Sequence, residues 1–353
     1  MAILTRYIGL AVAMGTLTVL MLLLALYSFI TFTDEIGSIG RGNYGIIDAL
    51  SYTALTAPMR IYELFPMAAL LGTLIGLGTL ASGSELTVMR AAGISPARIL
   101  AAAMLAGLLL AVAAMGIGEF IAPPAERYAQ EQRLDALERT ASIGRDGLWV
   151  RDGETFVHVR RIDADGRLTG IQLFEYDGLT LSRTVQALSG RHEDGHWQLQ
   201  DARLIHHDGI DAIKYEVRDN LTWISPLAPG MVRIVTSRPE TLALWELSEY
   251  IGYLQSNNLD AARYQLAFWT KLTVPLTTAV MVLLAVPFVF GSLRSGSIGQ
   301  RILIGSLIGI GFYLANQIMA RGGLVFDVAP VVAATLPTLL LLGVALLLMR
   351  RIR

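Results

Sequence analysis

Charged residues are distributed so unevenly along this chain that they leave six long uncharged stretches. Each stretch is long enough for a membrane-spanning helix, which needs about 20 residues to cross ~30 Å of hydrocarbon. With 54% hydrophobic and 16% charged residues, the chain is also too apolar for an ordinary soluble protein. We therefore predict an α-helical membrane protein with six transmembrane helices, at residues 7–33, 64–84, 99–118, 272–293, 302–320 and 328–349.

The first stretch raises the alternative of a cleaved signal peptide. Its apolar run is far longer than the roughly 7 to 15 residues of a signal-peptide core, which favours a first span. Two Gly-x-x-x-Gly pairs, Gly72 with Gly76 and Gly305 with Gly309, lie within predicted spans. Small residues at this spacing let helix backbones approach closely, so both pairs are predicted to be helix contacts.

Arginine gives the predicted spans a direction across the membrane. If the N-terminus is cytoplasmic, the inner segments carry eight arginines, and the short outer loops carry only Arg41, Arg60 and Arg321. Basic residues collect on the cytoplasmic side, so both chain ends are predicted to be cytoplasmic and residues 123–262 to be outside. In this topology Glu85 is the only cytoplasmic carboxylate.

The outer block between the third and fourth spans has a different chemistry. It holds six Asp-Gly pairs, each a strong hairpin signal when strands flank it. Apolar and polar residues alternate between the pairs, as in Thr155–Arg160 and Trp197–Gln200. This pattern predicts an all-β domain of about eight strands, built as a sandwich, a jelly roll or an open barrel. The pairs begin at residues 146, 152, 165, 177, 194 and 208, and the chain has no cysteine that could form a disulfide.

A further helix is predicted between the strands and the fourth span, over Pro239 to Leu254. One of its stripes is apolar, and the other carries Thr241, Trp245, Ser248 and Gly252. Such a helix is expected to lie near the outer membrane surface and to lead the chain into the membrane.

Several catalytic and metal-binding patterns are missing from the sequence. The chain has two lysines, Lys214 and Lys271, and neither lies in the Gly-Lys-Ser/Thr sequence of a phosphate-binding loop. All five histidines fall in the outer block, and none forms His-Glu-x-x-His. No serine lies in a Gly-x-Ser-x-Gly elbow, and residues 291–297 are predicted to be a tight cytoplasmic turn. We therefore predict no catalytic residue, no metal site and no nucleotide site in this chain.

Charged residues gather at the outer ends of the spans and are absent from their centres, which argues against a proton- or ion-coupled carrier. Glu119 ends the third span and Lys271 begins the fourth. Lys271 has two interpretations. Its side chain could extend to the outer interface, or it could bind an anionic ligand at the membrane surface.

A polar segment, Ser84–Gly93, interrupts the apolar sequence between the second and third spans. Ser82 and Glu85 match a Ser-x-x-Glu capping box, and Gly93 is a suitable helix end, so a short helix along the cytoplasmic surface is predicted. Leu86 and Met89 would share one face. Glu85 could simply complement the helix N-terminus. Alternatively, the helix could engage a separate nucleotide-binding subunit, because the chain has no ATP site of its own.

The same segment resembles the coupling helix of the lipopolysaccharide export permeases, the LptF and LptG family, and most closely the LptG branch. Further matching segments occur in the same order along nearly the whole chain. They are Phe65–Gly72, Gly118–Pro123, Tyr264–Lys271 and Phe290–Ser295.

This resemblance implies an inner-membrane permease of an ABC transporter, with membrane helices in residues 1–122 and 263–353 and a periplasmic β-jellyroll domain with flanking helices in residues 123–262. It implies an LptF-like partner subunit, an LptB-like ATPase dimer that binds ATP and Mg, and LptC. Lipopolysaccharide would leave the membrane and pass through the β-domain towards LptA. The alternative function is a non-transporting membrane scaffold that presents a periplasmic β-domain, and a third option is an intramembrane hydrolase.

The resemblance also suggests site residues. Glu85, Leu86, Met89 and Arg90 would couple the chain to the ATPase. Similar sequences often carry lysines after the first span, whereas this chain has Asp34, Glu35 and only Arg41 there. Phosphate binding would then fall to basic residues elsewhere as well. The predicted lipopolysaccharide contacts are Arg41, Arg133 and Lys271, with Leu26, Ile30, Ile310 and Tyr313 lining the lipid cavity.

Overall fold

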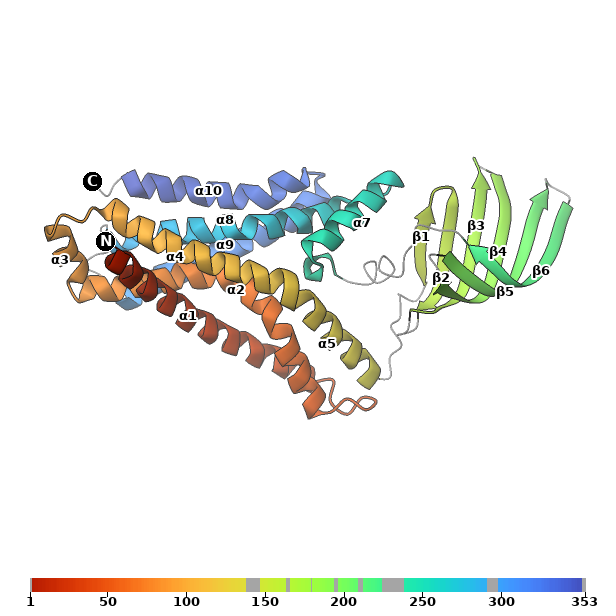
Figure 1. Ribbon diagram of the computed structural model, residues 1–353, viewed down its shortest axis with the longest axis horizontal. Coiled ribbons are helices and arrows are strands. Elements are labelled where there is room, and N and C mark those ends of the chain that lie inside the picture. The colour runs from red at the N-terminus through yellow and green to blue at the C-terminus, as the bar shows by residue number, and fades with distance from the viewer. Residues whose placement is uncertain are drawn as a thin grey trace.

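The computed structural model describes residues 2–137, 147–162, 166–178, 180–193, 196–208, 212–223, 238–290 and 298–350. Six of its helices are long and apolar enough to cross a membrane, which confirms the predicted number of spans. They lie side by side in one bundle (Figure 1). The spans are α1 (Ala2–Ile36), α2 (Ile46–Ser82), α4 (Pro96–Gly116), α8 (Ala262–Phe290), α9 (Ile298–Val325) and α10 (Pro330–Arg350).

The helices extend beyond the uncharged stretches that predicted them. The third span continues without a break through a π-helical turn, η1 (Ile117–Ile121), into α5 (Ala122–Ala136). Arg60 and Arg321 lie within α2 and α9, so their assignment to outer loops is wrong. A charged side chain near a helix end can reach water while its backbone stays helical, so a charge does not mark the end of a helix.

Helix α2 is the central helix of the bundle, and glycines set how closely its neighbours approach. A Cβ atom on Gly72 would overlap the backbone of Thr16 in α1, and one on Gly76 would overlap the carbonyl of Ala11. On another side of α2, Gly305 and Gly309 of α9 admit side chains of α2. Both Gly-x-x-x-Gly pairs are therefore helix contacts, as predicted.

The outer block forms one antiparallel sheet whose six described strands follow each other in chain order. Among the described residues the strands make a meander, without the crossovers of a jelly roll. Residues 224–237 of the outer block lie outside the described part, so the predicted number of about eight strands stays a prediction. The strands are β1 (Leu148–Asp152), β2 (Thr155–Ile162), β3 (Leu168–Asp177), β4 (Thr180–Glu193), β5 (His196–Asp208) and β6 (Ala212–Trp223).

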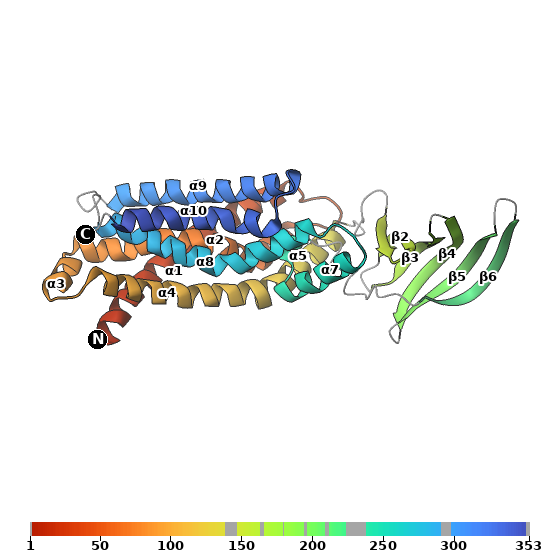
Figure 2. The same ribbon diagram turned by 90° about the horizontal axis from the view of Figure 1, so that it is seen from above.

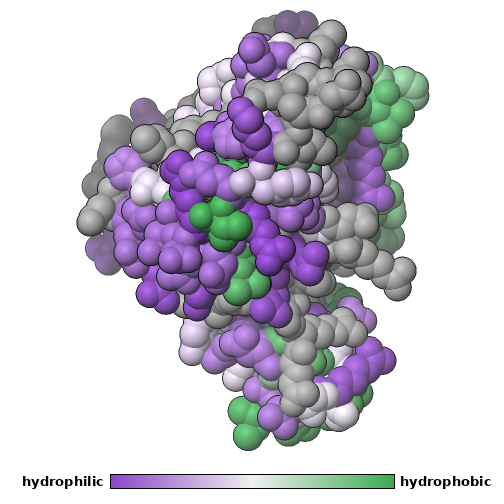
Figure 3. Space-filling view, turned by 90° about the vertical axis from the view of Figure 1, so that its right-hand side faces the viewer, coloured by the Kyte–Doolittle hydropathy of each residue, from purple (hydrophilic) through white to green (hydrophobic). Residues whose placement is uncertain are grey.

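Turn chemistry and strand pairing explain this sheet. Five of the six Asp-Gly pairs fall at the five junctions between consecutive strands, as the hairpin interpretation requires. Apolar side chains line up across four strands in the row Val157, Leu173, Val185 and Leu204, and all four are buried. The surface seen from the sheet end is mostly hydrophilic (Figure 3), as expected for a domain in water.

The helix predicted over Pro239–Leu254 begins five residues later than predicted, at Leu244. Pro239–Thr241 forms a single 3-10 turn, η2, and the chain is extended at Leu242 and Ala243 before α7 (Leu244–Ser256) begins. Helix α7 starts there because Glu246 accepts a hydrogen bond from the Ala243 amide, 3.0 Å away, and so ends the extended segment. Figures 1 and 2 show α7 at the end of the bundle that faces the sheet.

Candidate functional site

The short helix α3 (Glu85–Ala91) lies at the end of the bundle opposite the sheet, beside both chain termini (Figure 1). Its inner side is anchored, because Leu86 is 3% exposed and both Leu86 and Met89 pack into the core of the bundle. Arg90 is exposed on the surface, and so is Val88, with 66% of its surface accessible. Of the four predicted coupling residues, Leu86 and Met89 therefore hold α3 in place. Val88 is an exposed apolar residue that the sequence analysis did not select.

The predicted capping box at the start of this helix is wrong. Helix α3 begins at Glu85 itself, after Ser84 in a left-handed conformation with φ 63°, so Glu85 is too early to fill the third helical position. The Ser82 hydroxyl instead donates to the carbonyl of Thr79, 2.9 Å away, at the end of α2. Glu85 Oε2 accepts a hydrogen bond of 2.7 Å from the Tyr7 hydroxyl. The acid thus connects α3 to α1.

At the other end of the bundle, the structure brings two of the predicted basic residues into one region. The α1–α2 loop packs on the end of α5, where the Asn43 amide donates to the Ala136 carbonyl at 2.8 Å. This contact places the exposed Arg41 at the end of the helix that carries Arg133. The two arginines are candidates for one anion-binding surface, since guanidinium groups bind phosphate in a bidentate manner.

Arg133 is held by a buried acid. Its Nε atom donates to Glu35 Oε2 at 2.9 Å, and the Tyr44 hydroxyl donates to the same oxygen, also at 2.9 Å. Burial raises the pKa of the Tyr44 phenol, and the hydrogen bond to Glu35 raises it further, so Tyr44 stays a donor at neutral pH. The Arg133 side chain is still 27% exposed. It is therefore an arginine that Glu35 orients and that still reaches the surface.

Lys271 lies elsewhere. Its side chain is 4% exposed and its Nζ atom contacts Glu119 Oε1 at 3.2 Å, so the prediction that it extends to the outer interface is wrong. Glu119 precedes Arg133 by 14 residues on one continuous helix. At 1.5 Å per residue, that is about 21 Å along the axis. The structure thus separates Lys271 from Arg41 and Arg133, and engages it inside the protein.

The four predicted cavity residues lie on α1 and α9, which both pack against α2. Leu26, Ile30, Ile310 and Tyr313 are 48 to 59% exposed, as lipid-facing side chains would be. Arg60 of α2 lies next to this region: its guanidinium is 4.6 Å from the ring of Tyr27, beside Leu26, and it pairs with Glu63 at 2.6 Å. Arg60 was not among the predicted site residues because its position in the sequence indicated a loop.

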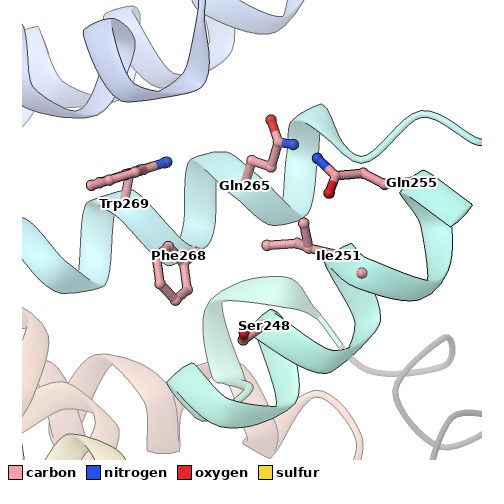
Figure 4. Close-up of a pocket in the computed structure, with 7 residues that line it drawn as sticks. Ser248, Ile251, Gln255, Gln265, Phe268 and Trp269 are labelled. Carbon is pink, nitrogen blue, oxygen red and sulfur yellow. The ribbon is translucent and has the colours of Figure 1, made fainter.

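A pocket of about 360 Å³ opens between α7 and α8 (Figure 4). The side-chain amides of Gln255 and Gln265 lie near each other above Ile251, and Phe268 and Trp269 line the α8 side. Of the residues that line this pocket, the sequence pattern had grouped Ser248 and Gly252 on one stripe of the predicted helix. Among the described residues, no group of three or more His, Asp or Glu side chains is placed to hold a metal ion.

Six helices long and apolar enough to cross a membrane, with an antiparallel sheet between the third and the fourth, define a multi-pass membrane protein with a β-domain. The chain belongs to the family described as lipopolysaccharide export system permease LptF/LptG, which matches residues 6–351. It is 37% identical to the LptG permease protein of Haemophilus influenzae over 343 residues, covering 96% of this chain and 95% of the relative.

Other relatives show which branch this chain resembles. It is 34% identical to LptG of Escherichia coli K12, with 95% of this chain and 94% of the relative covered. Identity to LptF of the same organism is 23%, with coverages of 91% and 87%. The chain is therefore an LptG-like permease, which confirms the resemblance seen in its motifs.

Proposed function

We propose that this chain is the LptG-like permease subunit of an ABC transporter that extracts lipopolysaccharide from the inner membrane and passes it through the β-domain. Membership of the lipopolysaccharide export family supports the substrate. The observation that supports a separate motor is α3, a short helix with exposed Arg90 and Val88 whose other face is anchored in the bundle. ATP and Mg would be bound by an LptB-like ATPase dimer. An LptF-like subunit, LptC and LptA would complete the path.

The anchoring of α3 is what makes it suitable as a coupling element. Leu86 packs with the core residues of α2 and α4, and Glu85 is bonded to Tyr7 of α1. Packed cores respond to a push by moving as units, because their interiors are dense and do not compress. A force applied by the ATPase to α3 would therefore reach all three helices. In the orientation that we propose, α3 and both termini lie in the cytoplasm and the sheet lies in the periplasm.

On the lipid side, we propose that the exposed apolar faces of α1 and α9 contact the acyl chains. Arg41 and Arg133 would bind the lipid phosphates, with Glu35 holding the Arg133 Nε atom and leaving the outer nitrogens of its fork for the ligand. Arg60 is a further candidate. Lys271, which is buried on Glu119, would act through the protein rather than by touching lipid in this conformation.

The test of this function is Glu85→Ala in a reconstituted complex with the LptF-like subunit and the ATPase. Loss of a hydrogen bond to a charged group costs about 1.5–3 kcal/mol, so we expect ATPase affinity and ATP-driven lipopolysaccharide release to fall by roughly tenfold or more. Glu249→Ala, which removes an exposed acid on α7, is the control. Complete assembly and normal release by Glu85→Ala would overturn the coupling role. A scaffold would bind its partners without releasing lipid when ATP is added.

Tyr7→Phe separates docking from force transmission. Removing the hydroxyl leaves Glu85 in place for the ATPase but cuts its 2.7 Å bond to α1. Because this bond is exposed, we expect a modest effect: unchanged ATPase co-purification, with lipopolysaccharide release per ATP hydrolysed lowered about two- to fivefold. Tyr128→Phe is the matched control, since among the described residues its hydroxyl accepts a hydrogen bond only from Gln132 of the same helix. Equal release per ATP in the two variants would show that the Tyr7 bond carries no force.

A further inference from the structure

Glu119 lies where three helices meet near the outer end of the bundle. Its side chain is 8% exposed, and both carboxylate oxygens have partners. Oε1 accepts from Lys271 Nζ of α8 at 3.2 Å, and Oε2 accepts from the backbone amide of Leu244, the first residue of α7, at 2.7 Å. One carboxylate thus joins the third span, the fourth span and α7.

The local backbone is adapted to this junction. Glu119 lies in the π-helical turn η1, a type of interruption that is common at functional sites. At the preceding Gly118, a Cβ atom would overlap the ring of Tyr62 in α2. The Tyr62 hydroxyl donates to the Lys271 carbonyl at 3.0 Å, and Lys271 Nζ lies 5.7 Å from the Tyr62 ring centroid. Tyr62 of the second span therefore packs against both Gly118 and Lys271 at this junction.

A second ion pair holds the same end of α7. Arg127 of α5 pairs with Glu246 of α7, and Glu246 Oε2 also accepts the Ala243 amide. The first amides of a helix have no partner within it and carry partial positive charge, so a carboxylate is the natural group to hold them. Here one such carboxylate, Glu119, comes from a membrane span.

The opposite end of α7 is attached to the sheet. The Tyr253 hydroxyl donates to the Arg151 carbonyl of β1 at 2.7 Å, and the Gly153 amide donates to Asn257 Oδ1 at 2.9 Å. Leu254 packs in the same apolar cluster as the strands. With 13 residues, α7 spans about 20 Å between its two attachments.

We propose that Glu119 is a positioning residue: its hydrogen bond to the Leu244 amide ties α7, and through it the β-domain, to the third span, beside the fourth span that carries Lys271. Burying two charges in a membrane protein is costly unless both are fully bonded, and apolar side chains could fill the space at lower cost. The buried Glu119 carboxylate is therefore better explained by its role in orienting α7 than by a contribution to the stability of the protein. This inference rests on the proposed function for its purpose: movement of the spans would turn the β-domain towards the emerging lipid.

Two double variants separate the tie to α7 from the ion pair. Glu119→Gln with Lys271→Met removes both charges but keeps an amide oxygen that can accept from Leu244. Glu119→Leu with Lys271→Met also leaves no buried charge but removes the acceptor. Because the chain has no cysteine, spin labels can be placed at Gln132→Cys on α5 and Leu188→Cys on β4, both exposed, in the full complex.

The variant with Glu119→Gln and Lys271→Met is called the Gln/Met variant, and the one with Glu119→Leu and Lys271→Met the Leu/Met variant. We expect one narrow distribution of label-to-label distances in the parent protein and in the Gln/Met variant. In the Leu/Met variant we expect a broad distribution. Lipopolysaccharide release should fall several-fold only in the Leu/Met variant, with ATPase co-purification unchanged. A narrow distribution in the Leu/Met variant, or equal broadening in both, would overturn the proposal. The distances do not depend on transport, so they test the tie even if the proposed function fails.

If the Leu/Met variant does not accumulate, Glu119→Asp provides the test. Aspartate keeps the negative charge for Lys271 but is one methylene shorter, so it cannot reach both Lys271 and the Leu244 amide from the same backbone position. A broadened distribution is expected, and a narrow one would overturn the proposal.

Discussion

Replacing Gly72 with alanine should leave little folded protein, although alanine is the better helix former. The added methyl group would overlap the backbone of Thr16 where α1 crosses α2, and backbone atoms cannot rotate away as a side chain can. Overpacking of a dense interior typically costs about 1–3 kcal/mol and occasionally more, and here a whole helix must shift. We expect a strongly reduced yield in membranes and a thermal midpoint in detergent that is several degrees lower.

The matched control is Gly343→Ala in α10, where a Cβ atom meets nothing within 4 Å. The chemical change is identical, and helix propensity alone favours alanine by about 1 kcal/mol. We therefore expect unchanged or slightly higher stability for this variant. Equal behaviour of the two variants would show that the α1–α2 crossing is not as close as described. Both can be measured by thermal unfolding followed by size-exclusion chromatography.

Trp197→Ala is expected to unfold the β-domain while leaving the helical bundle assembled. Trp197 is fully buried in β5, opposite His192 of β4 and Trp223 of β6 in the strand register. Removing a buried tryptophan costs about 3–5 kcal/mol, which is a large part of the total stability of a domain. Limited proteolysis should cut the sheet and spare the membrane spans. Under the proposed function, lipopolysaccharide should no longer be passed onward.

Trp149→Ala in β1 removes the same side chain from an exposed position. Trp149 is 55% exposed and stacks on Phe174 with ring centroids 5.8 Å apart. Such an aromatic contact is worth about 0.5–1.5 kcal/mol beyond its buried area. The sheet should therefore keep its protease resistance in this control. A Trp197→Ala variant as resistant as this control would place Trp197 outside the core.

Local patterns were sufficient for much of this fold. Uncharged stretches predicted all six spans, and Asp-Gly pairs predicted the strand junctions, because each signal depends on neighbouring residues only. Glycine spacing predicted two close helix contacts, since close packing of helix backbones requires small residues. The capping box failed because it places the helix start at Gly83, whereas the helix begins two residues later, at Glu85.

The candidate binding residues were less predictable, because the ion-pair partner of a charged residue can be distant in the sequence. Lys271 looked like an interfacial lysine, yet its partner Glu119 lies 152 positions away. Arg133 could have been solvated, but Glu35, 98 positions away, holds it. Arg60 was assigned to a loop because an arginine among apolar residues was taken as a span boundary, whereas Tyr27 and Glu63 accommodate it inside α2.

Residue order alone thus predicted the number of spans, a β-sheet within the outer block and a short polar helix with a single acid. These properties follow from length, hydrophobicity and turn chemistry, which act over a few residues. Folding in three dimensions decided that Glu85 is bonded to α1, that Leu86 faces inward, and that Glu119 joins α7 to two spans. Those contacts arise because buried charges and helix ends must be satisfied, and their partners come from other helices.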